Sequence, residues 1–161
     1  MGQRLILLDS LKRGRARWKG ARLPAYVIQS HVDCFCGPRA ADDTILPRGL
    51  LTVRYGAVVA RATAINGEYS AELYWTVDSL FDRVERDLRG GTEHDLASIV
   101  GRPTIAEEFV RKATRLDLHP QYGFPIRYGA ETPEIPDIWI DIRVDTFAVL
   151  ARPTPRSRSR P

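Results

Sequence analysis

Two stretches of the chain alternate apolar and polar side chains with a period of two. In residues 137–147 every other position is aliphatic, namely Ile138, Ile140, Ile142 and Val144. The positions between them are Trp139, Asp141, Arg143 and Asp145. In residues 25–36 the same period places Tyr26 and Ile28 on one side and His31 and Asp33 on the other. Side chains of a β-strand point to alternate faces, so each stretch is predicted to be a strand with one face turned into a core.

Two further stretches have the period of a helix with one apolar face. Residues 3–19 bring Leu11 and Trp18 near one side among basic residues, and Gly20 is the expected end of this helix. Gly14 is expected to weaken it by about 1 kcal/mol relative to alanine. Thr76 is a good N-cap for a second helix, whose apolar stripe is Val77, Leu80, Phe81, Val84 and Leu88. All five stripe residues are expected to face the core.

The remaining segments are predicted to be shorter strands and one short helix. A turn at Gly56 joins two of the strands into a hairpin, and the short helix covers residues 104–113. Strands are predicted at residues 50–55, 58–65, 71–75, 115–119 and 124–128. This order indicates an α+β fold. We expect an antiparallel sheet of about six strands with two main helices packed on one face.

The length and charge of the chain are typical of one domain followed by a basic tail. The 161 residues, 43% of them apolar, suffice for one core, which we assign to residues 1–150. Residues 151–161 are rich in proline, arginine and serine and are predicted to be disordered. The tail's four arginines equal the net charge of +4. Residues 23–150 carry 13 basic and 19 acidic side chains, so no specific nucleic-acid partner is expected.

The sequence contains no apolar run that approaches the ~18–20 residues of a transmembrane helix. The apolar run at residues 5–8 is too short for the core of a signal peptide. We therefore expect a soluble protein without a transmembrane segment, and this favours the cytoplasm while leaving the location open.

Several motifs occur in an order that is informative as a set. They are Trp18, Tyr26, Cys34-Phe35-Cys36, the segment 76–81 (Thr-Val-Asp-Ser-Leu-Phe) and the Gly-Phe-Pro of residues 123–125. Over residues 10–147 this order resembles a family of small bacterial domains of unknown function, many of them predicted lipoproteins or exported proteins. The resemblance implies a fold of the kind predicted above and no established activity. The chain differs from the family in lacking an export signal, in having Leu118-His119 where a Tyr-Asp pair is usual, and in an insertion around residues 91–112.

Cys34 and Cys36 are the residues that most suggest chemistry. They are two apart on a predicted strand, so their side chains share a face and their Cα atoms lie ~6.5–7 Å apart. That spacing is the upper limit for a disulfide. Buried thiols, a local disulfide and a redox or metal site all remain open. A thiol-dependent redox or hydrolytic enzyme is the corresponding alternative function. Because alternation turns His31 to the other face, too few ligands gather for zinc, and we predict neither a metal nor a cofactor.

His119 is a second candidate for chemistry. It lies on a strand before a tight turn, with Asp117 on the same face, which is an arrangement for a general base. The competing interpretation is an exposed histidine at the end of a strand.

The candidate binding residues are His31, Tyr122, Trp139 and Asp141. Tyr122, Phe124 and Trp139 are expected to cluster near one end of the sheet, and Trp139 lies opposite the isoleucine face of its strand. The predicted function is a non-enzymatic domain that binds a partner protein through a partly open sheet face. Weak electrostatic association of the tail and first helix with nucleic acid or an anionic membrane is a further alternative.

Overall fold

The computed structural model describes residues 2–35, 49–63, 75–89, 112–132 and 135–151, without the side chains of residues 32–35, 49, 63, 132 and 135–138. Its elements in chain order are α1 (Gly2–Ala21), β1 (Ala25–Phe35), β2 (Gly49–Arg54), β3 (Ala57–Thr63), α2 (Val77–Leu88), β4 (Lys112–Leu118), β5 (Pro125–Thr132) and β6 (Ile135–Val149). The predicted α+β class and the antiparallel sheet of six strands are confirmed.

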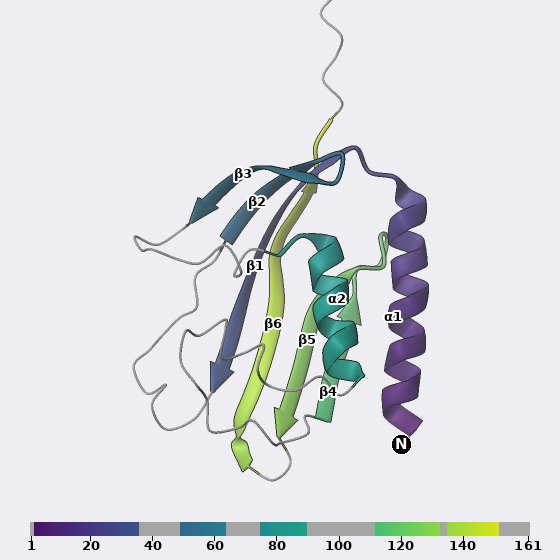
Figure 1. Cartoon of the computed structure of the whole chain (residues 1–161), viewed down its shortest axis with the longest axis vertical. Coiled ribbons are helices and arrows are strands. Elements are labelled where there is room, and N and C mark those ends of the chain that lie inside the picture. Colours follow the sequence, from purple (N-terminus) through teal and green to yellow (C-terminus); the bar gives the residue numbers. More distant parts are fainter. Residues whose placement is uncertain (1, 36–48, 64–74, 90–111, 133–134, 152–161) are drawn as a thin grey trace, which may run out of the picture.

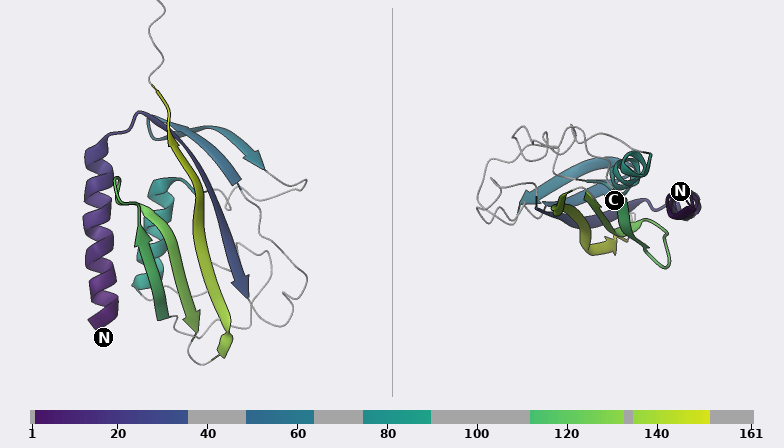
Figure 2. Two further views of the ribbon diagram at one scale, coloured as in Figure 1. Left: turned by 180° about the vertical axis from the view of Figure 1, so that it is seen from behind. Right: turned by 90° about the horizontal axis from the view of Figure 1, so that it is seen from below.

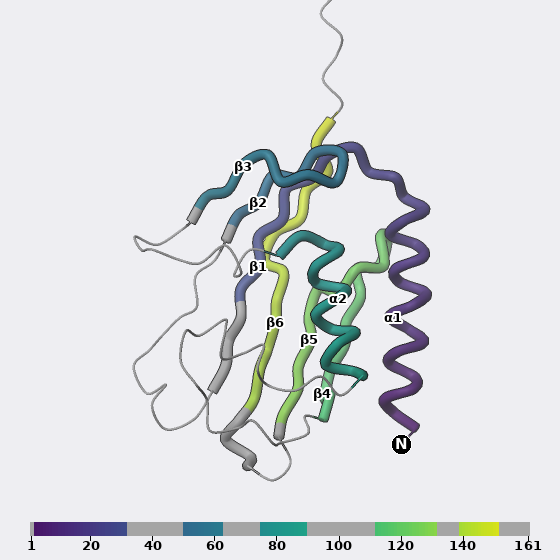
Figure 3. The backbone as a smooth tube through the Cα atoms, viewed as in Figure 1, coloured from purple at the N-terminus to yellow at the C-terminus, as the bar shows by residue number. Residues whose placement is uncertain are grey.

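The sheet has the strand order β3-β2-β1-β6-β5-β4 (Figure 1). The two alternating stretches of the sequence are β1 and β6, which run side by side along the middle of the sheet (Figure 3). On the core face Ile28 is fully buried, and Ile140 and Ile142 are 1% and 2% exposed. The alternation that predicted these strands therefore also identified their buried face.

Helix α2 lies over one face of the sheet and α1 stands alongside it beyond the β4 edge, so neither helix covers the opposite face (Figure 2). Thr76 caps α2, accepting a hydrogen bond from the backbone N–H of Ser79 through its hydroxyl. The predicted stripe is buried along its whole length: Val77, Leu80, Phe81, Val84 and Leu88. The side-chain hydroxyl of Tyr26 accepts a further hydrogen bond, at 3.3 Å, from the backbone N–H of Val77. The start of α2 is thus fixed both by its own cap and by β1.

Helix α1 packs against α2 and against the turn between β4 and β5. Arg15 forms ion pairs with Asp82 and Glu85 of α2 at 2.8 and 3.0 Å. Gly14 is buried against Gly123, and a β-carbon built on Gly123 would lie 2.7 Å from the carbonyl oxygen of Gly14. A residue that weakens a helix in isolation is therefore what allows this helix to approach the turn so closely.

The predicted end of α1 was wrong by two residues. The helix continues through Gly20 to Ala21, and Arg22 takes the left-handed conformation with a φ of 46°. This conformation is the one that glycine usually supplies after a helix.

Four strands carry an extra residue that interrupts the regular pairing. On β6, Thr146 pairs with Gln29 of β1 and Val144 pairs with the next residue, Ser30. Asp145 therefore has no residue directly opposite it on β1 and forms a bulge. The outer strands β3 and β4 have similar bulges at Val59 and Thr114, and β5 has one at Ile126. Bulges bend a strand and redirect side chains next to them.

An aromatic cluster fills the core beside α1. Trp18 lies with its ring centroid 5.3 Å from Tyr26 and 5.7 Å from Phe124, and Phe147 contacts all three rings. Tyr122 and Phe124 belong to this group, as expected. Trp139 does not, because it lies on the other face of β6, so that part of the prediction was wrong.

Several predicted segments lie outside the described residues. They include the strand at 71–74, the short helix at 104–111 and the tail at 152–161. Where the short helix was expected to end, residues 112 and 113 begin β4 instead. Within the described ranges, no helix combines the length and apolar character needed to cross a bilayer.

Candidate functional site

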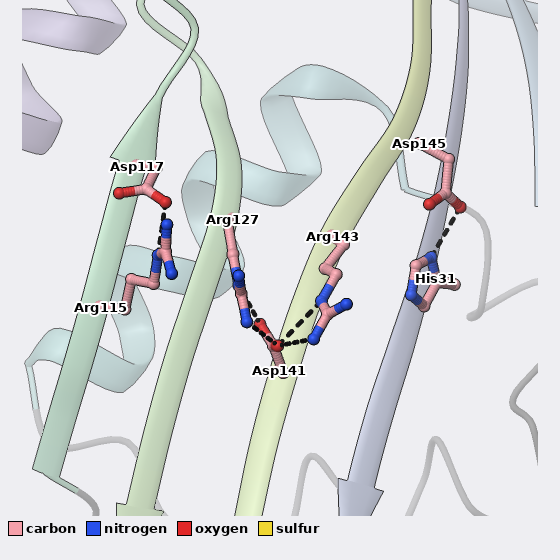
Figure 4. A network of polar contacts seen from close by, with 7 residues as sticks. All are labelled: His31, Arg115, Asp117, Arg127, Asp141, Arg143 and Asp145. Carbon is pink, nitrogen blue, oxygen red and sulfur yellow. Dashed lines mark hydrogen bonds and ion pairs between the residues drawn. The ribbon is translucent and has the colours of Figure 1, made fainter.

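The face of the sheet turned away from the helices carries charged side chains on four adjacent strands (Figure 4). We call this side of the sheet the polar face. The side chains drawn there are Arg115 and Asp117 of β4, Arg127 of β5, Asp141, Arg143 and Asp145 of β6, and His31 of β1. Trp139 of β6 and Glu131 of β5 lie on the same side, where both line a hollow. They lie together because alternation directs one set of side chains to each face of a strand.

Asp141 is the centre of the polar face. Arg127 donates to its two carboxylate oxygens at 3.1 and 2.8 Å, and Arg143 donates twice to Oδ2 at 2.9 and 2.5 Å. Burial alone would raise the pKa of Asp141, but these hydrogen bonds and the two positive charges outweigh it and hold the pKa below its ordinary value. Two guanidinium groups thus share one carboxylate, which leaves a net positive charge at this point.

Two further pairs flank this centre. On β4, the Nε of Arg115 donates to Asp117 at 2.5 Å. On the other flank, Nδ1 of His31 lies 2.6 Å from Oδ2 of Asp145. Asp145 is the bulged residue of β6, and the bulge brings its carboxylate to the histidine ring of β1. The seven side chains of Figure 4 are therefore held in one cluster of three and two pairs.

A shallow hollow of about 180 Å³ lies beside Asp141, between β4, β5 and β6. Gly129 is one of its lining residues, and a β-carbon there would come within 3.1 Å of Thr114 Oγ1 and 3.6 Å of Arg115 Cβ. Thr114 is the bulged residue of β4 opposite this glycine. Trp139, 41% exposed, stands at the rim with Arg115. The side chains of β4 therefore lie close against the backbone of β5 at Gly129.

Three of the four candidate binding residues, His31, Trp139 and Asp141, lie on the polar face. Two of them are less accessible than their position suggests, since His31 is 7% and Asp141 8% exposed. Tyr122 lies elsewhere, in the turn between β4 and β5, where its ring is 5.0 Å from that of His119.

His119 is a structural residue of the β4–β5 turn. Its Nδ1 accepts hydrogen bonds from the backbone N–H groups of Gln121 and Tyr122, both at 3.2 Å. Burial lowers the pKa of His119, which favours the neutral ring that these bonds need. Asp117 is paired with Arg115 instead. The geometry therefore does not form the His119–Asp117 general-base pair considered from the sequence.

The cysteine hypotheses concern residues outside the description. Cys36 and the side chain of Cys34 are not described, although the backbone of Cys34 pairs with Ile140 on β6. Within the described residues, no group of three or more histidine, cysteine, aspartate or glutamate side chains could hold a metal ion.

The sequence analysis did not single out Arg115, Arg127 or Gly129. Arg127 and Gly129 alternate with buried Tyr128 and Ala130 on β5, and this period of two was the available signal. The pairing of β5 with β6 brings Arg127 and Gly129 next to Arg143 and Asp141. This pairing is a tertiary contact, which the local sequence pattern does not reveal.

Comparison with known proteins gives one match. The model of a family of unknown function (DUF6174) matches residues 10–96. This region contains most of α1, strands β1–β3 and α2, and it ends before β4, whereas the resemblance described from motifs extends to residue 147. Of the seven side chains in Figure 4, only His31 lies in the matched region. No curated protein and no solved structure matches the chain.

Proposed function

We propose, since the chain belongs to this family of unknown function, that it is a non-enzymatic domain which binds a partner protein on the polar face of its sheet. The observation that carries the proposal is the exposed Trp139 beside a hollow, on a face where paired arginines are held in place.

The residue types on this face are those that dominate binding between proteins. Tryptophan and arginine are the side chains whose removal most often weakens a protein complex. Trp139 is 41% exposed on a strand whose other face is buried at Ile140. Trp139 and Arg115 both line the hollow, so both are available to a partner side chain that enters it.

The arginines are also ordered before a partner arrives. Asp141 fixes Arg127 and Arg143 through four hydrogen bonds. Ordering a flexible side chain on binding costs about 0.5–1.5 kcal/mol, and side chains already ordered avoid this cost. Because the cluster at Asp141 has a net positive charge, a carboxylate of the partner is the complementary group.

The proposal is tested with variants that remove contact groups without disturbing the core. The full chain is used to capture a partner from cells of its native host, and the purified partner is then titrated by calorimetry. We expect Trp139→Ala to weaken binding by a factor of about 30 or more, the size of an interface hot spot. Arg115→Gln is expected to weaken it about tenfold, since it removes a charged hydrogen-bond donor.

Tyr55→Asn is the matched control. Tyr55 is an 80% exposed aromatic residue in the β2–β3 turn, and asparagine tolerates its positive φ of 49°. We expect this variant to bind as the unmodified chain does. A partner that binds the Trp139→Ala and Tyr55→Asn variants equally well would refute the proposal.

A further inference from the structure

The side of α1 that faces away from α2 and the sheet is exposed from one end to the other. We call it the outer face of α1. Exposed positions recur every three or four residues, which is the spacing of one side of a helix. The exposed charged residues on α1 and just after it are Asp9, Lys12, Arg13, Arg17, Lys19 and Arg22. Five cations thus accompany a single acid.

Two of these cations already have partners, since Arg13 pairs with Asp9 on the same helix and Arg17 donates to the carbonyl oxygen of Pro120 in the β4–β5 turn at 3.0 Å. Arg15 is turned inward to Asp82 and Glu85, and Arg4 donates to the carbonyl oxygen of Leu88 at the end of α2. On the outer face, by contrast, Lys12 and Lys19 have no ion-pair partner among the described residues. The fold therefore does not require the charge of these two lysines.

Two large aliphatic side chains are exposed at the start of the same helix. Leu5 and Ile6 are each 65% exposed. Leu5 follows the same line along the helix as Lys12 and Lys19, at intervals of seven residues. An exposed aliphatic pair beside a row of cations offers a lipid surface both an apolar and a charged contact.

We infer that the outer face of α1 binds the surface of a bilayer that contains anionic lipids. Lys12, Arg13 and Lys19 lie among the headgroups, and Leu5 and Ile6 enter the boundary of the acyl chains. A nucleic acid would match the cations but would gain nothing from two aliphatic side chains. The acidic body also favours this orientation, because residues 23–150 carry 19 acidic against 13 basic side chains and are repelled by the same surface.

The test measures sedimentation of the full chain with vesicles of phosphatidylglycerol and phosphatidylcholine in equal parts. We expect binding that weakens as salt is added, and no binding to vesicles of phosphatidylcholine alone. The double variant Lys12→Gln/Lys19→Gln is expected to bind roughly 30-fold more weakly, because each cation near an anionic surface contributes about a factor of five.

Three further double variants separate the helix from other sources of binding. Arg54→Gln/Lys112→Gln removes the same charge from exposed positions on the sheet and should leave the affinity nearly unchanged. Leu5→Ser/Ile6→Ser should weaken binding by about tenfold, and the loss should persist at high salt. Arg158→Gln/Arg160→Gln tests the tail and should have a smaller effect than the lysine pair.

The inference is overturned by any of three results. These are equal binding to both kinds of vesicle, an equal loss of affinity from the lysine pair and the sheet control, and binding to a DNA duplex of matched charge that is tighter than binding to the anionic vesicles.

Discussion

Replacing Gly14 by alanine tests whether the contact between α1 and the β4–β5 turn determines stability. On helix propensity alone, this substitution would stabilise the protein by about 1 kcal/mol. In the structure, however, a β-carbon at this position would overlap the carbonyl oxygen of Gly123 and lie 3.0 Å from Leu118 Cδ1. The obstacle at Gly123 is backbone, so a change of rotamer does not relieve it.

The size of the effect follows from the required movement. Carbon and carbonyl oxygen atoms approach to about 3.3 Å without strain, so α1 must withdraw by about 1 Å. That movement loosens the packing of Leu11 and Trp18, which are 2% and 8% exposed. Overpacking of this kind costs about 1–3 kcal/mol, so after the propensity gain of about 1 kcal/mol we expect a net loss of up to about 2 kcal/mol and a Tm lower by up to roughly 8 °C.

Gly20→Ala is the matched control on the same helix. A β-carbon there meets no atom within 4 Å. Only the propensity gain applies, so stability should rise by up to about 1 kcal/mol. The assay is urea unfolding of both variants, followed by circular dichroism. If Gly14→Ala is as stable as Gly20→Ala, the close contact between α1 and the turn does not exist as described.

Three further predictions concern single polar groups. Tyr26→Phe removes the hydrogen bond from Val77 and should lower the free energy of unfolding by about 1 kcal/mol. Because burial raises the pKa of Tyr26 to about 12, the unmodified protein should lose stability as the pH rises from about 10 towards that value. An ultraviolet titration in which every tyrosine ionises near pH ~10 would contradict this. Asp141→Asn should destabilise the protein by about 1–2 kcal/mol in low salt. Since the carboxyl pKa is lowered in the fold, the contribution of Asp141 to stability is present above about pH 4 and is lost as the pH falls. Unfolding of the Asn variant should therefore be less sensitive to acid, and equal sensitivity would show that pairing with Arg127 and Arg143 adds nothing to stability. The pKa of His119 is also lowered, so the contribution of this ring to stability is complete above about pH 6.5 and declines below it. NMR titration of the ring should show a pKa below that of an ordinary histidine. An ordinary pKa would contradict the role of Nδ1 as a hydrogen-bond acceptor in the turn.

The fold was accessible from the sequence where one local pattern decided the structure. Alternation in β1 and β6 identified both the strands and their buried faces, as Ile28 and Ile140 show. Helix α2 was equally well specified by Thr76 and its apolar stripe. In each case the spacing of side chains within a single element carries the information, and no knowledge of neighbouring elements is needed.

The features that were missed depend on contacts between elements. Gly14 was judged by helix propensity alone, although Gly123 from a distant turn decides its role. The bulge at Asp145 adds one residue to β6 and is visible only in the pairing with β1, which also brings the carboxylate to His31. The hollow over Gly129 likewise requires the register of β5 against its neighbours.

The candidate site was only partly accessible for the same reason. Alternation placed His31, Trp139 and Asp141 on one face, but it could not show that Asp141 is enclosed by two arginines. Arg127 comes from a strand predicted as a short return after a turn, and only the pairing of β5 with β6 brings it to Asp141.

The bulges on the two edge strands affect how easily copies of this protein pair with one another at high concentration. An open sheet exposes unpaired backbone N–H and C=O groups along its two edge strands, where a neighbouring molecule could add a strand of its own. Here Val59 interrupts β3 and Thr114 interrupts β4, so neither border offers a straight, uninterrupted row of donors and acceptors. These bulges therefore make both edge strands poorer templates for a strand of a neighbouring molecule.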